Sequence, residues 1–345
     1  MASLALAEWD RLLPRARVAE LLPRLAIAAQ REGIFDRLPE PVAKHLTTGL
    51  ALAGAQRRVA EWELHCLERE LAPLGAPVML LKGAAYVAAR LPMAEGRLFG
   101  DVDIMVPEAN LERAQSILLD AGWLFEESEE YDRRYYLRWM HELPPLRHSG
   151  RGSVLDVHHA ILPRTSRLKP ESARLWAQAR PLAGSSFVVP CPADMLLHSA
   201  AHLFQDGDMD LMLRDLLDIH DMAELFGKEP EFWPELISRA EELDLARPLF
   251  YAMRYRERIL GAGPPTAVAT RLGGKGPGRL ARAVMDRAVP PVLLPPTHDQ
   301  GRLRRPAALF LYVRSHWLRM PPLLLASHLA RKSLRRLRMA EPEGE

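Results

Sequence analysis

The feature that most constrains the fold of this chain is a short run in which two carboxylates alternate with apolar residues, Gly100-Asp101-Val102-Asp103-Ile104-Met105-Val106. A period of two, with β-branched residues between the carboxylates, predicts a strand that has one apolar face. Asp101 and Asp103 then stand together on the opposite face, where they repel each other unless they are protonated, solvated or bridged by a cation. Mg²⁺ is such a bridge, because it prefers oxygen ligands and completes its shell with water and substrate phosphates. The run therefore indicates phosphoryl or nucleotidyl transfer.

A second alternating run supplies a third carboxylate. In Val154-Leu155-Asp156-Val157-His158, Asp156 and His158 share the polar face of a predicted strand. Three carboxylates on neighbouring strands can hold two Mg²⁺ ions, of which one activates the attacking hydroxyl and the other neutralises the leaving diphosphate. His158 either touches the metal or substrate, or braces Asp156 from behind.

A strand-to-helix turn at Lys82 and Gly83 precedes these carboxylates. The apolar residues 78 to 81 predict a strand, and the alanine-rich residues that follow predict a helix. Gly83 permits a close backbone approach at the turn, the helix offers its first amides to an anion, and Lys82 adds a positive charge for a phosphate. Arg97, four residues before Asp101, either contacts the substrate or pairs with Asp101 or Asp103.

Five segments in order along residues 78 to 226 resemble one known family. They are Leu-Leu-Lys-Gly-Ala-Ala-Tyr at 80 to 86, Arg97 with Gly-Asp-Val-Asp at 100 to 103, Leu-Asp-Val-His at 155 to 158, residues 192 to 202, and Leu-Arg-Asp-Leu at 213 to 216. Together they resemble the uncharacterised nucleotidyltransferase-like family, which belongs to the superfamily that shares the DNA polymerase β-type palm. Members occur in bacterial biosynthetic clusters for ribosomally made peptides such as lasso peptides, and some are thought to modify a phosphorylated peptide.

The resemblance implies transfer from a nucleoside triphosphate or nucleotide-sugar donor to a hydroxyl or phosphate of an acceptor, plausibly a peptide, with Mg²⁺ or Mn²⁺. It implies Asp101, Asp103 and Asp156 as catalytic metal ligands. The chain departs from the superfamily where Ala84 follows Gly83, since a phosphate-binding serine is usual there. Lys82 and Arg97 replace that serine, or the donor is not an ordinary nucleoside triphosphate.

Three polar residues of the later segments are also predicted to bind or orient substrate. His202 follows His198 by four residues, which is a zinc-binding spacing, but Ser199 occupies the position where a metalloprotease needs glutamate. We therefore expect His202 to reach the active-site cleft or to form a hydrogen bond within the helices. Arg214 and Asp215 are expected to link those helices to the catalytic sheet or to orient the substrate.

The predicted architecture is α+β, a nucleotidyltransferase palm with a small mixed sheet between N-terminal helices and a C-terminal helical bundle. Residues 1 to 75 predict several short helices broken by prolines, residues 76 to 190 the palm, and residues 191 to 345 the bundle. Further strands are expected at 123 to 125, 135 to 143 and 153 to 158. The glycine-rich residues 273 to 278 lack the features of a P-loop and predict a mobile loop, and the acidic residues 206 to 210 predict a helix cap.

Composition limits the partners. The 46 basic and 44 acidic residues nearly cancel, which argues against a surface built to coat nucleic acid. Two cysteines, Cys66 and Cys191, do not form a disulfide framework, the N-terminus lacks the pattern of a signal peptide, and no apolar stretch reaches the roughly 20 residues of a membrane span. These observations favour the cytoplasm.

The last residues carry a basic amphipathic pattern between 323 and 338. It suits an acidic peptide, RNA or an anionic membrane surface, or else a solvated terminal helix that covers the bundle. Two other functions therefore stay open beside the transferase. One is a non-catalytic palm that binds a peptide or nucleotide, and the other is an RNA-modifying transferase or toxin component.

Overall fold

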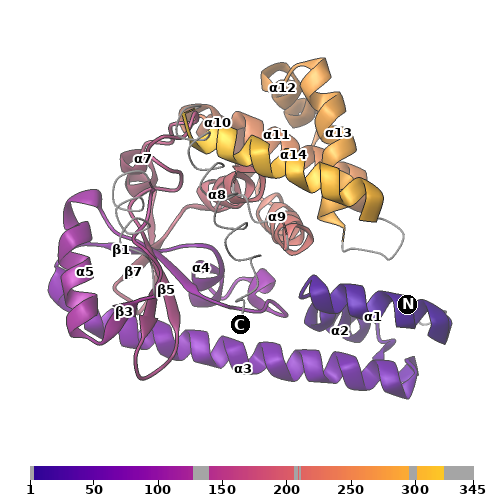
Figure 1. The fold of residues 1–345 in the computed structure, drawn as a ribbon, viewed down its shortest axis with the longest axis horizontal. Helices are drawn as coiled ribbons and strands as arrows, with labels where there is room; N and C mark the ends of the chain where they lie inside the picture. Colours follow the sequence, from indigo (N-terminus) through magenta and orange to yellow (C-terminus); the bar gives the residue numbers. More distant parts are fainter. Residues whose placement is uncertain (1–3, 127–139, 206–208, 210, 295–300, 322–345) are drawn as a thin grey trace, which may run out of the picture.

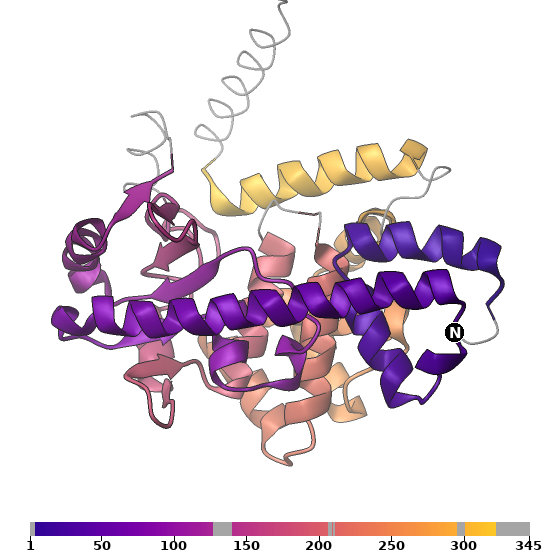
Figure 2. The same cartoon turned by 90° about the horizontal axis from the view of Figure 1, so that it is seen from below.

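The computed structural model describes residues 4–126, 140–205, 209, 211–294 and 301–321. The chain begins with two short helices, α1 (Leu6–Val18) and α2 (Leu22–Arg31), and continues in α3 (Glu40–Glu70), which has 31 residues. In Figures 1 and 2, α3 runs the length of the molecule, from α1 and α2 to the sheet. The expectation of several short helices throughout this region is wrong for α3. Pro39 and Pro41 lie at its start, where a missing amide hydrogen costs nothing, so they begin the helix.

Seven strands form one mixed sheet in the order β3-β4-β5-β2-β1-β7-β6. The central pair β2 and β5 is parallel, β1 is antiparallel to β2 and parallel to β7, and the outer pairs are antiparallel. The strands are β1 (Val78–Leu80), β2 (Val102–Met105), β3 (Trp123–Phe125), β4 (Leu146–His148), β5 (Val154–His158), β6 (Arg180–Pro181) and β7 (Phe187–Val189). The mixed sheet with helices at both ends confirms the predicted α+β class.

The predicted strands correspond to β1, β2, β3 and β5, whereas β4, β6 and β7 were not predicted. These three have two or three residues each, too few to show a period of two. Most of the strand expected at 135 to 143 lies outside the described residues. Its last part forms an isolated bridge between Glu142 and His158, which places residues 141 to 143 beside β5.

Two short helices, α4 (Lys82–Ala88) and α5 (Leu111–Asp120), accompany the first strands, and α7 (Ser172–Ala177) precedes β6. The 3₁₀ turns are η1 (Phe35–Arg37), η2 (Ala72–Leu74), η3 (Pro92–Ala94) and η4 (Glu108–Asn110). The second half of the chain is helical: α8 (Pro192–Gln205), α9 (Met212–Phe226), α10 (Phe232–Glu242), α11 (Ala246–Leu260), α12 (Thr266–Lys275), α13 (Arg279–Leu293) and α14 (Gly301–Arg319).

One hydrophobic cluster continues from the sheet through α8 to α13 and includes Leu311 of α14. A separate cluster joins α1, α2 and the first half of α3. The domain boundaries expected from the sequence stay predictions. The loop expected at 273 to 278 is wrong in its first half, because Gly273, Gly274 and Lys275 form the last residues of α12.

Two other predicted features lie outside the described residues. They are the basic segment at 323 to 338 and nearly all of the acidic segment at 206 to 210. Among the described residues, no helix combines the length and the apolar character that crossing a membrane requires.

Candidate active site

Three predicted carboxylates meet where the central strands run side by side. Asp103 lies on β2 with its side chain buried, and parallel pairing sets it opposite Asp156 of β5. Asp101 comes directly before β2, two residues from Asp103, and therefore lies on the same side of the sheet. The alternation in the sequence thus placed these three groups together correctly.

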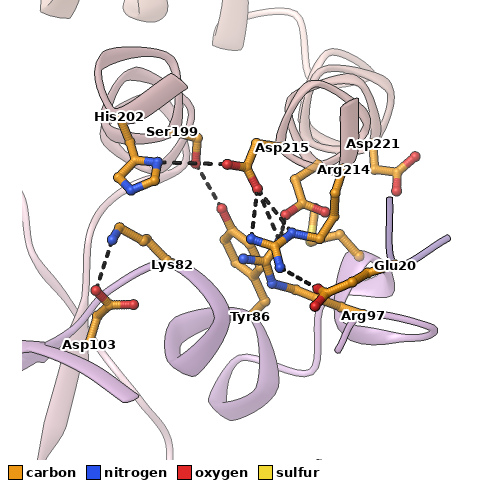
Figure 3. A network of polar contacts seen from close by, with 12 residues as sticks. Glu20, Lys82, Tyr86, Arg97, Asp103, Ser199, His202, Arg214, Asp215 and Asp221 are labelled. Carbon is orange, nitrogen blue, oxygen red and sulfur yellow. Dashed lines mark hydrogen bonds and ion pairs between the residues drawn. The ribbon is translucent and has the colours of Figure 1, made fainter. Parts of the chain in front are cut away.

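Asp103 has two close partners. Its Oδ1 accepts a hydrogen bond from Lys82 Nζ at 2.9 Å and lies 3.1 Å from Nε2 of His158 (Figure 3 shows the lysine contact). Burial acts to raise the pKa of Asp103, but the charge of Lys82 and the hydrogen bond of His158 outweigh it, so that pKa is well below its usual value. The same pairing outweighs burial at Lys82 and raises the pKa of its ammonium. His158 therefore braces Asp103, where the sequence had suggested Asp156.

The other two carboxylates titrate in the opposite direction. The charge of Asp103, followed by burial, raises the pKa of Asp101. Burial, followed by the charges of Asp103 and Glu142, raises the pKa of Asp156 to about 7. The cluster thus resists carrying all of its negative charge, as expected for like charges held close together. A bound cation would remove that cost.

Gly83 is not among the residues that face the cavity described below. It lies within α4, and a Cβ on it would stand 3.0 Å from the Phe99 ring and 3.3 Å from Nε of Arg97. The close approach at this glycine is therefore made by side chains of the chain itself. Lys82, at the start of α4, adopts a positive φ of 43°.

Arg97 and Arg214 bind to acidic residues, mostly of α9. Arg97 forms ion pairs with Asp218 and, at 3.8 Å, with Asp215. Arg214 binds Glu20 at 2.6 Å and its neighbour Asp215 at 3.1 Å. Arg97 thus ties the loop before β2 to α9 (Figure 3).

Asp215 also contacts Nδ1 of His202, at 3.7 Å. Burial acts to raise the pKa of Asp215, but His202 and the two arginines, Arg214 and Arg97, outweigh it and lower that pKa. His202 and Asp215 therefore join α8 to α9 at the site.

A cavity of about 210 Å³ lies between the sheet, α4, α8 and α9. It is lined by Glu20, Lys82, Tyr86, Arg97, Gly100, Asp101, Asp103, Ser199, His202, Leu211, Arg214, Asp215 and Asp218. Seven predicted site residues are in this lining, whereas Gly83, Asp156 and His158 are not. The lining has three permanent cations and five carboxylates, so it is acidic although it contains a lysine and two arginines.

The sequence profile of a family described as "Uncharacterised nucleotidyltransferase" matches residues 5–261, about three quarters of the chain. The chain belongs to this family. The match extends from α1 to the end of α11, so it contains every residue that lines the cavity and leaves out α12 to α14. Comparison with curated proteins and with solved structures gave no match. A mixed sheet between helices is consistent with a nucleotidyltransferase fold.

Four polar residues that line this cavity were missed in the sequence. Tyr86 and Ser199 share a hydrogen bond of 2.8 Å, and Asp218 and Glu20 bind the arginines. Helical spacing could have indicated three of them, because residues three or four apart lie on the same face of a helix. Tyr86 follows Lys82 by four residues, Ser199 precedes His202 by three, and Asp218 follows Arg214 by four. Glu20 lies in the turn between α1 and α2, where no pattern singles it out.

The residues present fit a hard divalent cation. Asp101, Asp103 and Asp156 offer carboxylate oxygens, which Mg²⁺ prefers, on two paired strands and the residue before one of them. The charge of Asp103 acts to raise the pKa of both Asp101 and Asp156, in addition to burial, and a cation among the three would offset this repulsion. Lys82 supplies one cation to these three carboxylates.

Proposed function

We propose that this family member is a Mg²⁺-dependent nucleotidyltransferase, which moves a nucleotidyl group from a nucleotide donor to a hydroxyl or phosphate of an acceptor. The observation that carries the proposal is the position of Asp101 and Asp103 in the wall of one cavity, with Asp156 in register beside Asp103. Such an arrangement suits in-line transfer, which needs positioning and neutralisation of charge more than covalent chemistry.

The charge of the cavity supports a donor that enters with its metal ions. Five carboxylates against three permanent cations repel a bare polyphosphate. A triphosphate or nucleotide-sugar that carries bound Mg²⁺ would be attracted instead, because the carboxylates would become ligands of the ions. When bound, the ions neutralise the leaving group and lower the pKa of the attacking hydroxyl.

The residues of the chain position the reactants. Lys82 and Arg214 reach the cavity from α4 and α9 and offer positive charge to donor phosphates. His158 holds Asp103 in place through its Nε2. In the transfer, the acceptor oxygen bonds to the α-phosphorus, the bond from that phosphorus to the bridging oxygen breaks, diphosphate or a sugar phosphate leaves, and the acceptor proton passes to solvent.

A peptide is the acceptor that we propose, and the resemblance of the sequence motifs supports it. The test uses the full chain with Mg²⁺, nucleoside triphosphates labelled at either the α- or the γ-phosphate, and a serine peptide with and without a phosphate. Nucleotidyl transfer moves the α-label to the peptide and releases diphosphate. Transfer of the γ-label alone would identify a kinase and overturn the proposal.

Variants of the carboxylates separate catalysis from binding. Asp101→Asn and Asp103→Asn, shown to be folded by circular dichroism, should lose at least about a hundredfold in rate, because each removes a carboxylate ligand of the proposed Mg²⁺ and so weakens charge neutralisation at the reacting phosphorus. Asp120→Asn, at the exposed end of α5, is the matched control and should react at the native rate. Tight nucleotide binding by calorimetry, with no turnover for any acceptor, would instead favour a binding protein.

A further inference from the structure

Two histidines and a glutamate gather at the end of β5, beside the cavity but outside its lining. His141, Glu142 and His158 each place one ligand atom within 4.8 Å of the others. Glu142 Oε2 lies 3.1 Å from Nδ1 of His158 and 3.8 Å from Nε2 of His141. Four-coordinate zinc, with bonds of 2.0 to 2.1 Å, sets its ligand atoms about 3.3 Å apart. The three side chains are thus close to the spacing of a metal site before any ion is bound.

The backbone holds this group rigidly. Glu142 is bridged to His158, the amide of Leu143 donates to Val157 O at 2.9 Å, and the amide of His159 donates to His141 O at 2.8 Å. On its other edge β5 pairs with β2, where the amide of Val106 donates to His158 O at 2.9 Å. Ligands fixed by backbone hydrogen bonds lose little entropy when an ion binds.

The orientation of His158 points independently to a cation. Its side chain is buried, and its Nδ1 forms no hydrogen bond even though Glu142 Oε2 is 3.1 Å away. Its Nε2 faces Asp103 Oδ1. A ligating histidine commonly gives its second ring hydrogen to a carboxylate in this way, which leaves the other nitrogen free to bind a metal. Nδ1 of His141 is likewise buried and forms no hydrogen bond.

We propose that His141, Glu142 and His158 bind a divalent transition-metal ion of the zinc type, at a site separate from the carboxylates of the cavity. Two imidazoles and one carboxylate suit zinc, cobalt or iron better than Mg²⁺, which takes oxygen ligands. Three protein ligands leave one position open for water. Because Nε2 of His158 contacts Asp103, the ion would hold this carboxylate of the cavity in place from behind.

The test uses Co²⁺ as the probe, with the untagged full-length chain, excess Mg²⁺ and no nucleotide. We expect one Co²⁺ per chain with the intense visible absorption of a four-coordinate site, and displacement by Zn²⁺. His141→Ala should weaken binding by more than about tenfold, the effect that loss of a supporting hydrogen bond alone can have at such a site. Glu142→Gln repeats the test with a smaller change, in case His141→Ala fails to fold.

Two controls define the position of the ion. His65→Ala, at an exposed position of α3, and Asp101→Asn, in the cavity, should both keep the native spectrum and affinity. Native affinity in folded His141→Ala and Glu142→Gln would overturn the proposal. So would loss of Co²⁺ in Asp101→Asn, which would place the ion at the carboxylates. Since no nucleotide is present, the result does not depend on the proposed transferase activity.

Discussion

Gly83 is confined by the Phe99 ring, which a Cβ would meet at 3.0 Å. We predict that Gly83→Ala lowers the free energy of unfolding by about 1–3 kcal/mol, because the ring or the backbone must shift to admit the methyl group. Gly54→Ala is a matched control within α3, where the nearest side-chain atom to the new Cβ would be Arg58 Nη1, 3.6 Å away. It should stabilise the chain by up to about 1 kcal/mol through helix propensity. Urea unfolding measures both, and equal effects would contradict the packing argument.

Asp215 makes the free energy of unfolding depend on pH. Its pKa in the folded chain is lowered, with burial outweighed by His202 and the two arginines, so its contribution is present above the pKa of about 4 of a free aspartate and is lost below it. We predict that Asp215→Asn is less stable than the native chain at pH 7 and that the gap narrows between about pH 5 and 3. Urea unfolding at several pH values tests this. A gap that stays constant through this window would contradict it.

The hydrogen-bond and ion-pair partners of individual site residues could not be predicted from the sequence. Alternation placed Asp103 and Asp156 on polar faces, because a period of two is a local property. The bond from Lys82 to Asp103 requires β1 to lie antiparallel to β2, and the partner of Arg97 comes from α9, more than a hundred residues later. Such pairings arise only from the tertiary fold. Spacing therefore suggested a phosphate for Lys82 and Asp101 or Asp103 as ion-pair partners of Arg97, whereas the ion pairs of Arg97 are with Asp215 and Asp218.

At the scale of elements, α9 joins the N-terminal helices to the site. Asp218 of α9 accepts from Arg24 of α2 and from Arg97, and its side chain is 3% exposed. We predict that Asp218→Asn lowers the free energy of unfolding by about 3–5 kcal/mol, because Arg24 and Arg97 lose the buried carboxylate that they share. Asp221→Asn removes the other contact of Arg24, but this carboxylate is 36% exposed, so the loss should stay below about 1 kcal/mol. Urea unfolding measures both losses. If the two variants lost similar stability, burial would not determine how much each ion pair contributes.

Element length decides which elements a sequence reveals. The helices α8, α9 and α11 have 14 or 15 residues, enough turns to show the apolar stripe from which a helical bundle was predicted in this part of the chain. β4 and β7 have three residues and were missed. The prolines at the start of α3 led to a wrong prediction of short helices. Proline breaks a helix in its interior, but it is favourable in the first turn, where these prolines lie.

At the scale of the molecule, the family match and the hydrophobic core have different limits. The match ends at residue 261, but α12, α13 and α14 contribute buried residues to the cluster that fills the sheet and α8. Arg314 of α14 also donates to Phe204 O of α8 at 2.8 Å. A region beyond the matched family therefore completes the core on which the cavity rests.

This continuity predicts a single cooperative unit. Leu311 of α14 is 6% exposed and belongs to the cluster of the sheet, whereas Leu309 on the same helix is 64% exposed. We predict that Leu311→Ala costs about 2–5 kcal/mol and Leu309→Ala less than about 0.5 kcal/mol. If the core unfolds as one unit, Leu311→Ala will lower the hydrogen-exchange protection of amides in β2, β5 and α8 by the same amount, because the protection of all three reports the same global opening. Loss of protection confined to α13 and α14 would mean that these helices unfold separately, and that the cavity does not depend on them.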